Sequence, residues 1–356
     1  MHVHGLKDNN DLQAYFNQRV QKIVAKHGKT MLGWDEILRP DLPKDIVIQS
    51  WRGPDSLAQA AKQGYRGLLS SGYYVDLMWS AERHYATEPQ SGAAASLTPE
   101  EQKRILGGEA CMWSEYVSPE NVDSRIWPRT AAIAERLWSP QDVRDVNSMY
   151  QRMAVTSRWL DGLGLTHNSS YAPMLRRIAG ADDIAGLKAL ADVLEPVKDY
   201  TREETAPAPA TSASPLNRVV DAVRPESATA RQFTDAVNEL VGGAAKPGVE
   251  ARVRELLNRW RDNQVELQSQ FEKSLLLKEV APVSQSLSAL GAAGLAALDY
   301  LDRSEPAPAA WVTAQLALVE QAKKAQAQLL IMVAPSVEKL VQASAGQPAP
   351  SSVPAK

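Results

Sequence analysis

Hydrophobic and polar positions follow two different periods along the first part of the chain. Apolar side chains at helical spacing occupy residues 11–27, at Leu12, Tyr15, Phe16, Val20, Ile23 and Val24, and the helix is expected to end at His27-Gly28. Short apolar runs of strand length lie at 30–34, 46–51, 67–70 and 105–113. Helices are expected at 55–64, from Thr98 onward and at 126–137. Strands alternating with helices predict parallel βα units, and four units form only half of an eight-stranded barrel.

From about residue 181 the pattern is helical almost throughout. One apolar stripe comprises Val253, Leu256, Trp260, Leu267 and Phe271, and another comprises Trp311, Leu318, Ala322, Ala325 and Leu329. Such stripes are typical of a helix-bundle core. We therefore expect an α/β chain with the C-terminal half of a (β/α)8 TIM barrel at 1–178 and an all-α helical domain at 179–345. A Pro/Ala/Ser-rich linker or loop is expected near 206–215 and a disordered tail at 346–356.

Composition and charge narrow the possible functions. The formal net charge is −3 and the pI about 6.0, without a basic cluster, so neither nucleic acid nor a charged membrane surface is an expected partner. No run of about 18 apolar residues predicts a membrane span. The first residues do not resemble a signal peptide. Cys111 is the single cysteine, so no intrachain disulfide or cysteine metal cluster is expected.

Each predicted strand ends in aromatic and carboxylate residues. The four ends read Gly33-Trp34-Asp35-Glu36, Gln49-Ser50-Trp51-Arg52, Tyr73-Tyr74-Val75-Asp76 and Gly108–Glu115. Active sites of α/β barrels lie at the carboxyl ends of strands, and aromatic faces with carboxylates suit the C–H faces and hydroxyls of sugars. Any one of these residues has a structural alternative. Trp34 and Trp51 could be core aromatics, and Asp76 and Glu115 could form loop salt bridges.

The combination resembles a known family. GWDEIL (33–38), QSWRG (49–53), YYVDL (73–77) and GGEACMWSEYV (107–117), followed by WPR…AERLWS (127–139), resemble the last four βα units of bacterial family 20 β-N-acetylhexosaminidases. Order and spacing agree over residues 1 to about 178. The resemblance implies release of terminal β-linked N-acetylglucosamine or N-acetylgalactosamine with retention, in which the substrate's own acetamido oxygen forms an oxazolinium intermediate.

The resemblance also implies roles for individual residues. Trp34, Trp51 and Trp113 would wall the acetamido pocket, and the hydroxyl of Tyr74 would hold the acetamido oxygen for attack. Asp76 and Glu115 would bind the outer hydroxyls of the sugar. Glu109 would be structural. The resemblance implies no metal and no organic cofactor, and the expected partner is an N-acetylhexosamine-terminated oligosaccharide or glycoconjugate.

One departure from the family pattern bears on activity. The general acid of the family is the Glu of a His-x-Gly-Gly-Asp-Glu motif, and that motif is expected shortly before residue 1. Asp35-Glu36 is not a substitute, because Trp34 precedes it and no His-x-Gly-Gly is present. We therefore expect a truncated polypeptide with little or no hydrolase activity alone. Full-length relatives are typically periplasmic or secreted. A non-catalytic carbohydrate-binding remnant and a helical interaction module are the alternative functions.

Overall fold

The computed structural model describes residues 4–39, 42–206, 210–243 and 245–346. It divides into two compact units, one of residues 1–114 with 126–163 and one of residues 115–125 with 164–356. We call them the sheet unit and the helical unit. The boundary expected near residue 178 remains a prediction about separately folding domains. The expected tail lies, from residue 347 onward, outside the described residues.

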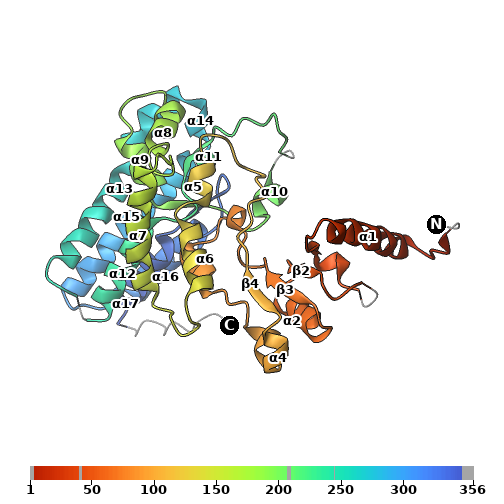
Figure 1. Ribbon diagram of the computed structural model, residues 1–356. Helices are drawn as coiled ribbons and strands as arrows, with labels where there is room; N and C mark the ends of the chain where they lie inside the picture. The colour runs from red at the N-terminus through yellow and green to blue at the C-terminus, as the bar shows by residue number, and fades with distance from the viewer. Residues whose placement is uncertain (1–3, 40–41, 207–209, 244, 347–356) are drawn as a thin grey trace. The chain divides into compact units, whose positions relative to one another are not determined.

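A four-stranded parallel sheet forms the centre of the sheet unit (Figure 1). Its strands are β1 (Leu32–Trp34), β2 (Val47–Ser50), β3 (Arg66–Leu69) and β4 (Ile105–Gly108), in that order across the sheet. Each overlaps one predicted apolar run, although β3 begins one residue earlier, at Arg66, and all three pairings are parallel. The carboxyl ends of the four strands therefore lie along one edge. No closed barrel is present in the described residues.

Helices connect these strands, with one departure from the expected bounds. The helix predicted at 126–137 begins only at Arg129, because Pro128 interrupts it, and α5 (Val122–Ile126) precedes the break. A proline cannot donate the backbone hydrogen bond of a helix interior. The predicted start at Thr98 is confirmed by a capping box with Glu101. The other elements are α1 (Asn9–Lys26), η2 (Asp35–Ile37), α2 (Pro54–Lys62), η3 (Val75–Leu77), α3 (Ala81–Ala86), η4 (Gly92–Ser96), α4 (Pro99–Gln102), α6 (Arg129–Trp138) and α7 (Val146–Gly162).

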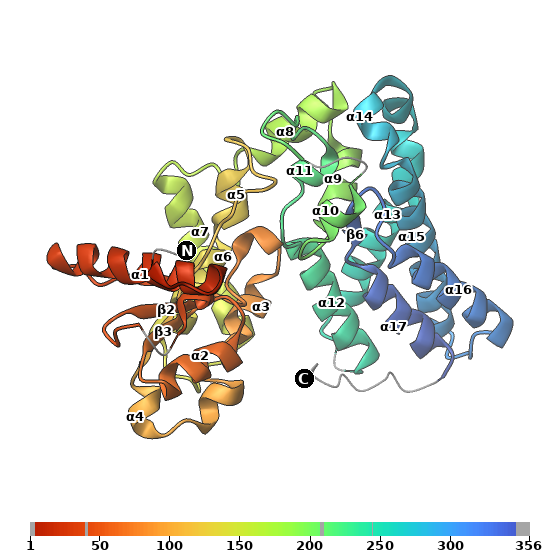
Figure 2. The same ribbon diagram turned by 90° about the vertical axis from the view of Figure 1, so that its right-hand side faces the viewer.

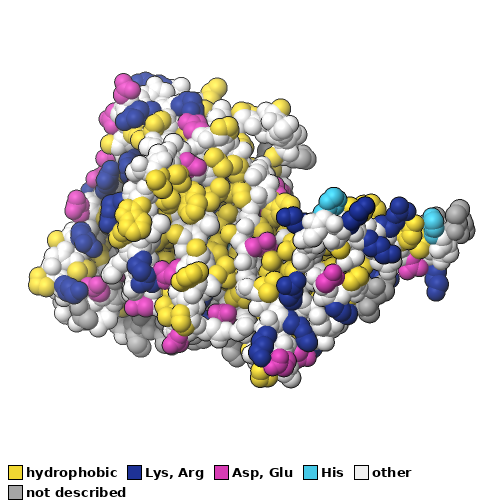
Figure 3. Space-filling model, viewed as in Figure 1, with side chains coloured by type: hydrophobic (Ala, Val, Ile, Leu, Met, Phe, Trp, Pro, Cys, Tyr) yellow, Lys and Arg dark blue, Asp and Glu magenta, His cyan; other side chains and the backbone are white. Residues whose placement is uncertain are grey.

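Helix α1 buries a face that its sequence does not favour. Its buried residues are Ala14, Asn17 and Gln21, and the Gln21 amide donates to Asp45 at 3.1 Å. The apolar stripe lies outward instead, with Phe16 63% and Ile23 59% exposed. Figure 3 shows hydrophobic side chains along this helix between basic ones. The stripe thus lacks a partner within the described residues, which an amphipathic helix normally has.

The helical unit is mostly helical, with its long helices side by side in Figure 2, but it is not all-α as expected. Two short strands, β5 (Leu194–Pro196) and β6 (Leu329–Ile331), pair antiparallel within it and were not predicted. The apolar stripe expected from Trp311 to Leu329 does not lie on one helix, because α16 ends at Ala322 and Leu329 begins β6. Its helices are α8 (Tyr171–Ala179), α9 (Ala185–Ala191), α10 (Thr201–Thr205), α11 (Val219–Ala222), α12 (Ala228–Val241), α13 (Val249–Lys273), α14 (Leu275–Lys278), α15 (Ala281–Asp302), α16 (Ala309–Ala322) and α17 (Ala334–Ser344).

Helices α13 and α15 make the closest packing of this unit. A Cβ at Gly291 would lie 2.5 Å from the backbone nitrogen of Arg261, and one at Gly294 would lie 2.6 Å from Leu257. Glycine at both positions therefore lets the two helices approach. Helix α15 is also the one described helix whose length and composition would suit a membrane span, and half of that apolar window is buried within the protein. A bundle core helix has the same properties.

The segment expected as a linker or loop, 206–215, has neither helix nor strand at its described positions, Ala206 and 210–215.

Candidate active site

Three aromatic side chains from the predicted site meet at the carboxyl edge of the sheet. Trp34 ends β1, Tyr74 follows β3 and Trp113 follows β4. The rings of Trp34 and Trp113 have centroids 5.5 Å apart, and those of Tyr74 and Trp113 are 6.5 Å apart, edge to face. Trp113 is 52% exposed, although apolar rings of this size are usually buried. The cluster thus presents an aromatic surface to solvent.

The loops that carry Tyr74 and Trp113 run in register beyond the strands. Tyr74 and Cys111 form an isolated parallel bridge, in which the Cys111 N–H donates to Tyr73 at 3.1 Å and the Val75 N–H donates to Cys111 at 2.9 Å. Gly108 makes this approach possible, because a Cβ there would lie 2.6 Å from the Tyr73 ring and 2.8 Å from the Leu69 carbonyl. Backbone pairing therefore fixes where both aromatic residues project.

Glu109 links three strands beneath this surface. Its Oε1 accepts hydrogen bonds from the amide of Gln49 at 2.7 Å and from the hydroxyl of Ser70 at 2.6 Å. The three residues come from β2, from the end of β3 and from the end of β4. These contacts agree with the structural role that the sequence indicates for Glu109.

Trp51 is held by the first strand end. Its indole N–H donates to Glu36 at 3.1 Å, and the Arg52 guanidinium forms a 2.9 Å ion pair with the same carboxylate. Asp35 is buried and accepts from the Arg52 backbone at 2.8 Å and from Ser56 at 2.5 Å. Asp35 therefore anchors the second strand end, and Glu36 orients Trp51.

Burial and two nearby carboxylates raise the pKa of the single cysteine, Cys111. Burial, followed by the negative charges of Glu109 and Asp76, raises the pKa of the Cys111 thiol to about 12. Desolvation and nearby carboxylates both disfavour the thiolate. Cys111 is half-buried on the β4 extension and stays protonated at neutral pH. It is therefore not a nucleophile at this edge.

Arg129 supports the loop of Tyr74 and Asp76 and was not singled out by the sequence. It is buried, and it donates to the carbonyl of Val75 at 2.7 Å and to that of Trp79 at 2.6 Å. Its only signal was its place in WPR (127–129). His84 lies in α3, where its Nδ1 is 2.8 Å from the Gly72 carbonyl. These contacts make both residues supports of the loop.

Glu115 belongs to the helical unit, although Trp113, two residues earlier, belongs to the sheet unit. Its side chain is exposed, and the following residue, Tyr116, is buried. The sheet unit thus brings together the rings of Trp34, Tyr74 and Trp113, with Asp76 in the same loop as Tyr74 and Trp51 tied to Glu36. Glu115 is positioned by other contacts, within its own unit.

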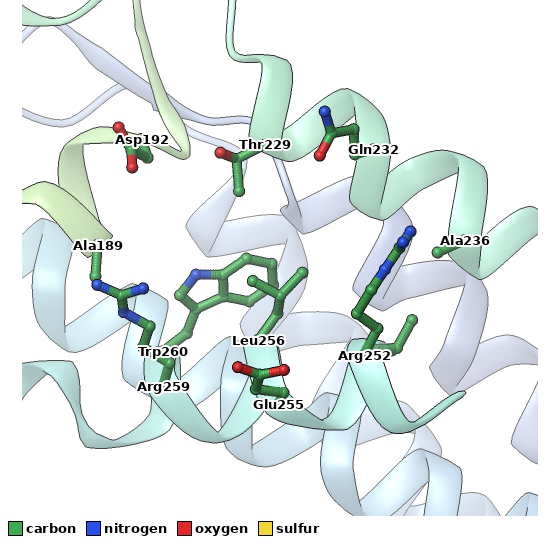
Figure 4. Close-up of a pocket in the computed structure, with 11 residues that line it drawn as sticks. Ala189, Asp192, Thr229, Gln232, Ala236, Arg252, Glu255, Leu256, Arg259 and Trp260 are labelled. Atoms are coloured by element: carbon green, nitrogen blue, oxygen red, sulfur yellow. The ribbon is translucent and has the colours of Figure 1, made fainter. Parts of the chain in front are cut away.

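The helical unit contains a separate pocket of about 320 Å³. Arg252, Glu255 and Arg259 of α13 line one side, and Thr229 and Gln232 of α12 line the other (Figure 4). The Trp260 indole lies between them but is 1% exposed, so its face is not available for stacking on a sugar. The described residues hold no group of three His, Cys, Asp or Glu side chains suited to a metal ion.

Comparison with known proteins identifies the origin of the sheet unit. Residues 1–141 match the family model described as glycosyl hydrolase family 20, catalytic domain. The first 141 residues belong to glycosyl hydrolase family 20. They include the strand ends with Trp34, Trp51, Tyr74, Asp76, Trp113 and Glu115. The family resemblance of the sequence motifs is thereby confirmed.

Relatives of family 20 extend the comparison to both units. The chain is 31% identical over 189 residues to β-hexosaminidase subunit β of Entamoeba histolytica, covering 47% of this chain and 32% of that protein. It is 30% identical over 234 residues to β-hexosaminidase of Porphyromonas gingivalis, covering 58% and 29%. The X-ray structure of Flavobacterium johnsoniae chitobiase has a TM-score of 0.85 at 36% identity, covering 96% of this chain and 52% of that one. The chain spans about a third of these curated relatives.

Proposed function

We propose that the chain is the C-terminal part of an exo-β-N-acetylhexosaminidase that releases terminal β-linked N-acetylglucosamine or N-acetylgalactosamine. The observation that carries this proposal is the assembly of the Trp34, Tyr74 and Trp113 rings from three strand ends of a family 20 sheet. Aromatic walls suit an N-acetyl group, whose methyl is apolar and whose amide is planar. The substrate is then an N-acetylhexosamine-terminated oligosaccharide or glycoconjugate.

The proposed mechanism is retaining and substrate-assisted. In this proposal Trp34, Trp51 and Trp113 enclose the acetamido group, and the hydroxyl of Tyr74 donates to its oxygen. Fixing that oxygen near the anomeric carbon replaces a bimolecular step with an intramolecular one, whose effective molarity can reach about 10⁵–10⁸ M. The acetamido oxygen attacks, the aglycone leaves, and water then opens the oxazolinium ion. Asp76 and Glu115 accept hydrogen bonds from the outer hydroxyls.

We further propose that the four βα units at 1–178 are half of an eight-stranded barrel. The sheet supports this, because β1 and β4 are edge strands of a four-stranded parallel sheet. Parallel sheets are almost always covered on both faces, and open edges are normally protected. The outward apolar stripe of α1, with Phe16 and Ile23, is likewise a surface that a further part of a barrel would cover.

The 356 residues contain no His-x-Gly-Gly-Asp-Glu sequence, so the family's general acid is absent from them. General acid catalysis contributes about 10²–10⁴-fold to rate. We therefore propose that this polypeptide alone binds the sugar but turns it over little or not at all. A non-catalytic carbohydrate-binding role is the second candidate, favoured by the half-exposed Trp113 beside two further rings.

Titration of the purified chain with N-acetylglucosamine, followed by tryptophan fluorescence, tests the proposed site. Trp113→Ala removes the ring that contacts both Trp34 and Tyr74, so we expect the affinity to fall by at least about tenfold, roughly 1.4 kcal/mol. Trp138→Ala is the matched control, because Trp138 is 93% exposed at the end of α6 and should leave affinity unchanged. Equal affinity of the Trp113→Ala and wild-type chains would exclude the aromatic cluster as the sugar site.

A further inference from the structure

The segment that carries Glu115 is built into the helical unit. Residues 115–125 belong to that unit, although they interrupt the sheet unit in sequence. Arg125 is completely buried and donates to the carbonyl of Val223 at 2.8 Å and to that of Asp221 at 2.8 Å. The amide of Asn121 also donates to the Asp221 carbonyl, at 3.2 Å. The end of the segment is therefore fixed to the backbone around α11.

The beginning of the segment is fixed by a second set of contacts, from α10. The guanidinium carbon of Arg202 lies 3.8 Å from the ring centroid of Tyr116, the residue after Glu115. Arg202 also forms a 2.5 Å ion pair with Asp221, and both side chains are almost completely buried. Its Nε donates to Gln328 at 3.2 Å. A planar guanidinium can stack on a ring and pair with a carboxylate at once, which a lysine cannot do equally well.

Charge places a further residue of α10 near Glu115. Burial, followed by the negative charge of Glu115, raises the pKa of Glu203 above its ordinary value. Glu203 follows Arg202 in the chain, so α10 lies against the start of the segment through both residues. Glu115 itself remains exposed while its neighbour Tyr116 is buried. This arrangement holds a carboxylate on the surface at a fixed place.

We propose that Arg202 is a positioning residue for Glu115, acting through Tyr116 and Asp221. The assignment of Glu115 to sugar hydroxyls rests on the proposed function; the positioning of the segment does not.

Hydrogen exchange of the whole chain tests the positioning. Tyr116→Leu removes the ring but leaves the Arg202–Asp221 pair intact, and we expect the amides of 115–120 to exchange at least about tenfold faster. Tyr116→Phe keeps the ring and should restore wild-type exchange. Arg303→Met is the matched control, because Arg303 lies 5.1 Å from the Tyr300 ring in the same unit and should leave 115–120 unchanged. Unchanged exchange of 115–120 in Tyr116→Leu, with α13 and α15 still protected, overturns the proposal.

A double-mutant cycle tests whether the effect passes through Glu115. Affinity for N-acetylglucosamine is measured for the wild-type chain, Tyr116→Leu, Glu115→Gln and the double variant. We expect each single change to weaken binding and the double variant to match Glu115→Gln, because a mispositioned group and an absent one lose the same contact. If the losses of sugar affinity in the two single variants are fully additive in the double variant, the proposal that Tyr116 acts through Glu115 is overturned. A wild-type chain that binds no sugar contradicts the proposed function instead, and the exchange experiment still decides the positioning.

Discussion

At the residue scale, the side chains around the strand ends divide into exposed aromatic rings and polar groups that hold neighbouring segments in place. Three polar side chains form hydrogen bonds with neighbouring strands or loops: Glu109, Asp35 and Arg129. The rings of Trp34 and Trp113 contact each other and leave surface exposed. Buried polar groups need such partners, because an unsatisfied one costs about 1–3 kcal/mol. The aromatic edge is therefore supported by a polar layer beneath it.

Cys111 gives a test of the environment at this edge. Because burial and the charges of Glu109 and Asp76 raise its pKa to about 12, its thiolate is nearly absent at pH 8. We expect iodoacetamide to alkylate the native chain on the order of a thousandfold more slowly than the urea-unfolded chain, whose thiol has a pKa near about 8.5. Mass spectrometry of timed samples measures both rates. Similar rates in the two states would show that Cys111 is not in this environment.

The aromatic cluster could be predicted from the sequence, but its support by Arg129 could not. The meeting of Trp34, Tyr74 and Trp113 follows from one rule, that the carboxyl ends of parallel strands share an edge. Arg129 could not be found in this way, because its partners are the backbone carbonyls of Val75 and Trp79, about fifty residues away in sequence. Carbonyl acceptors leave no residue-type signal.

At the element scale, the strands and long helices are predictable and the short pairings are not. Each parallel strand overlaps a short apolar run of the sequence, although only β2 is mostly buried, and Leu32 of β1 and Leu106 of β4 are exposed. By contrast, β5 and β6 have three residues each and lie more than 130 residues apart in sequence, so neither shows a period. The face that α1 buries was also unpredictable, because its apolar stripe lies outward and Gln21 faces Asp45.

The α13–α15 contact predicts opposite effects for two glycine substitutions. Gly291→Ala places a Cβ 2.5 Å from the Arg261 backbone, so we expect it to lower the free energy of unfolding by about 1–3 kcal/mol or more. Gly162→Ala has no atom within 4 Å of the added Cβ at the end of α7, and should be neutral or stabilise by up to about 1 kcal/mol. Urea unfolding followed by circular dichroism compares them. Equal midpoints would contradict the close packing.

The contact between α6 and α7 predicts that the free energy of unfolding depends on pH. Hydrogen bonds from Arg152, at 2.9 and 2.5 Å, lower the pKa of Glu135 below its ordinary value of 4.5. The folded state therefore gains stability above about pH 4.5, and the gain is lost as pH falls through the lowered pKa. For this half-exposed pair we expect Arg152→Gln to cost about 0.5–1 kcal/mol at pH 6.

Urea unfolding of the wild-type chain and of Arg152→Gln at several pH values measures the difference in their free energies of unfolding. The wild-type chain and Arg152→Gln should converge in stability as the pH falls below 4.5 and Glu135 becomes protonated. A difference that stays constant between pH 6 and pH 3 would contradict an electrostatic origin.

At the scale of the whole molecule, the two compact units are not two continuous stretches of sequence. Residues 1–141 match the family 20 catalytic domain and include the aromatic cluster. The helical unit takes residues 115–125 from the middle of that sequence and fixes them with Arg125 and Arg202. A Flavobacterium johnsoniae chitobiase aligns with 96% of this chain, whereas the family model ends at residue 141. The alignment with that structure therefore extends over the helical unit as well.

Saturation-transfer NMR of the chain with an aryl N-acetyl-β-glucosaminide reports both sugar binding and turnover in one sample. We predict strong saturation of the acetamido methyl group and an anomeric signal of the intact glycoside that persists for hours, because the proposed sugar-binding residues are present and the sequence holds no His-x-Gly-Gly-Asp-Glu motif. Rapid loss of that signal, with appearance of the free sugar, would contradict the absence of turnover. No saturation of the methyl group would contradict the sugar site itself.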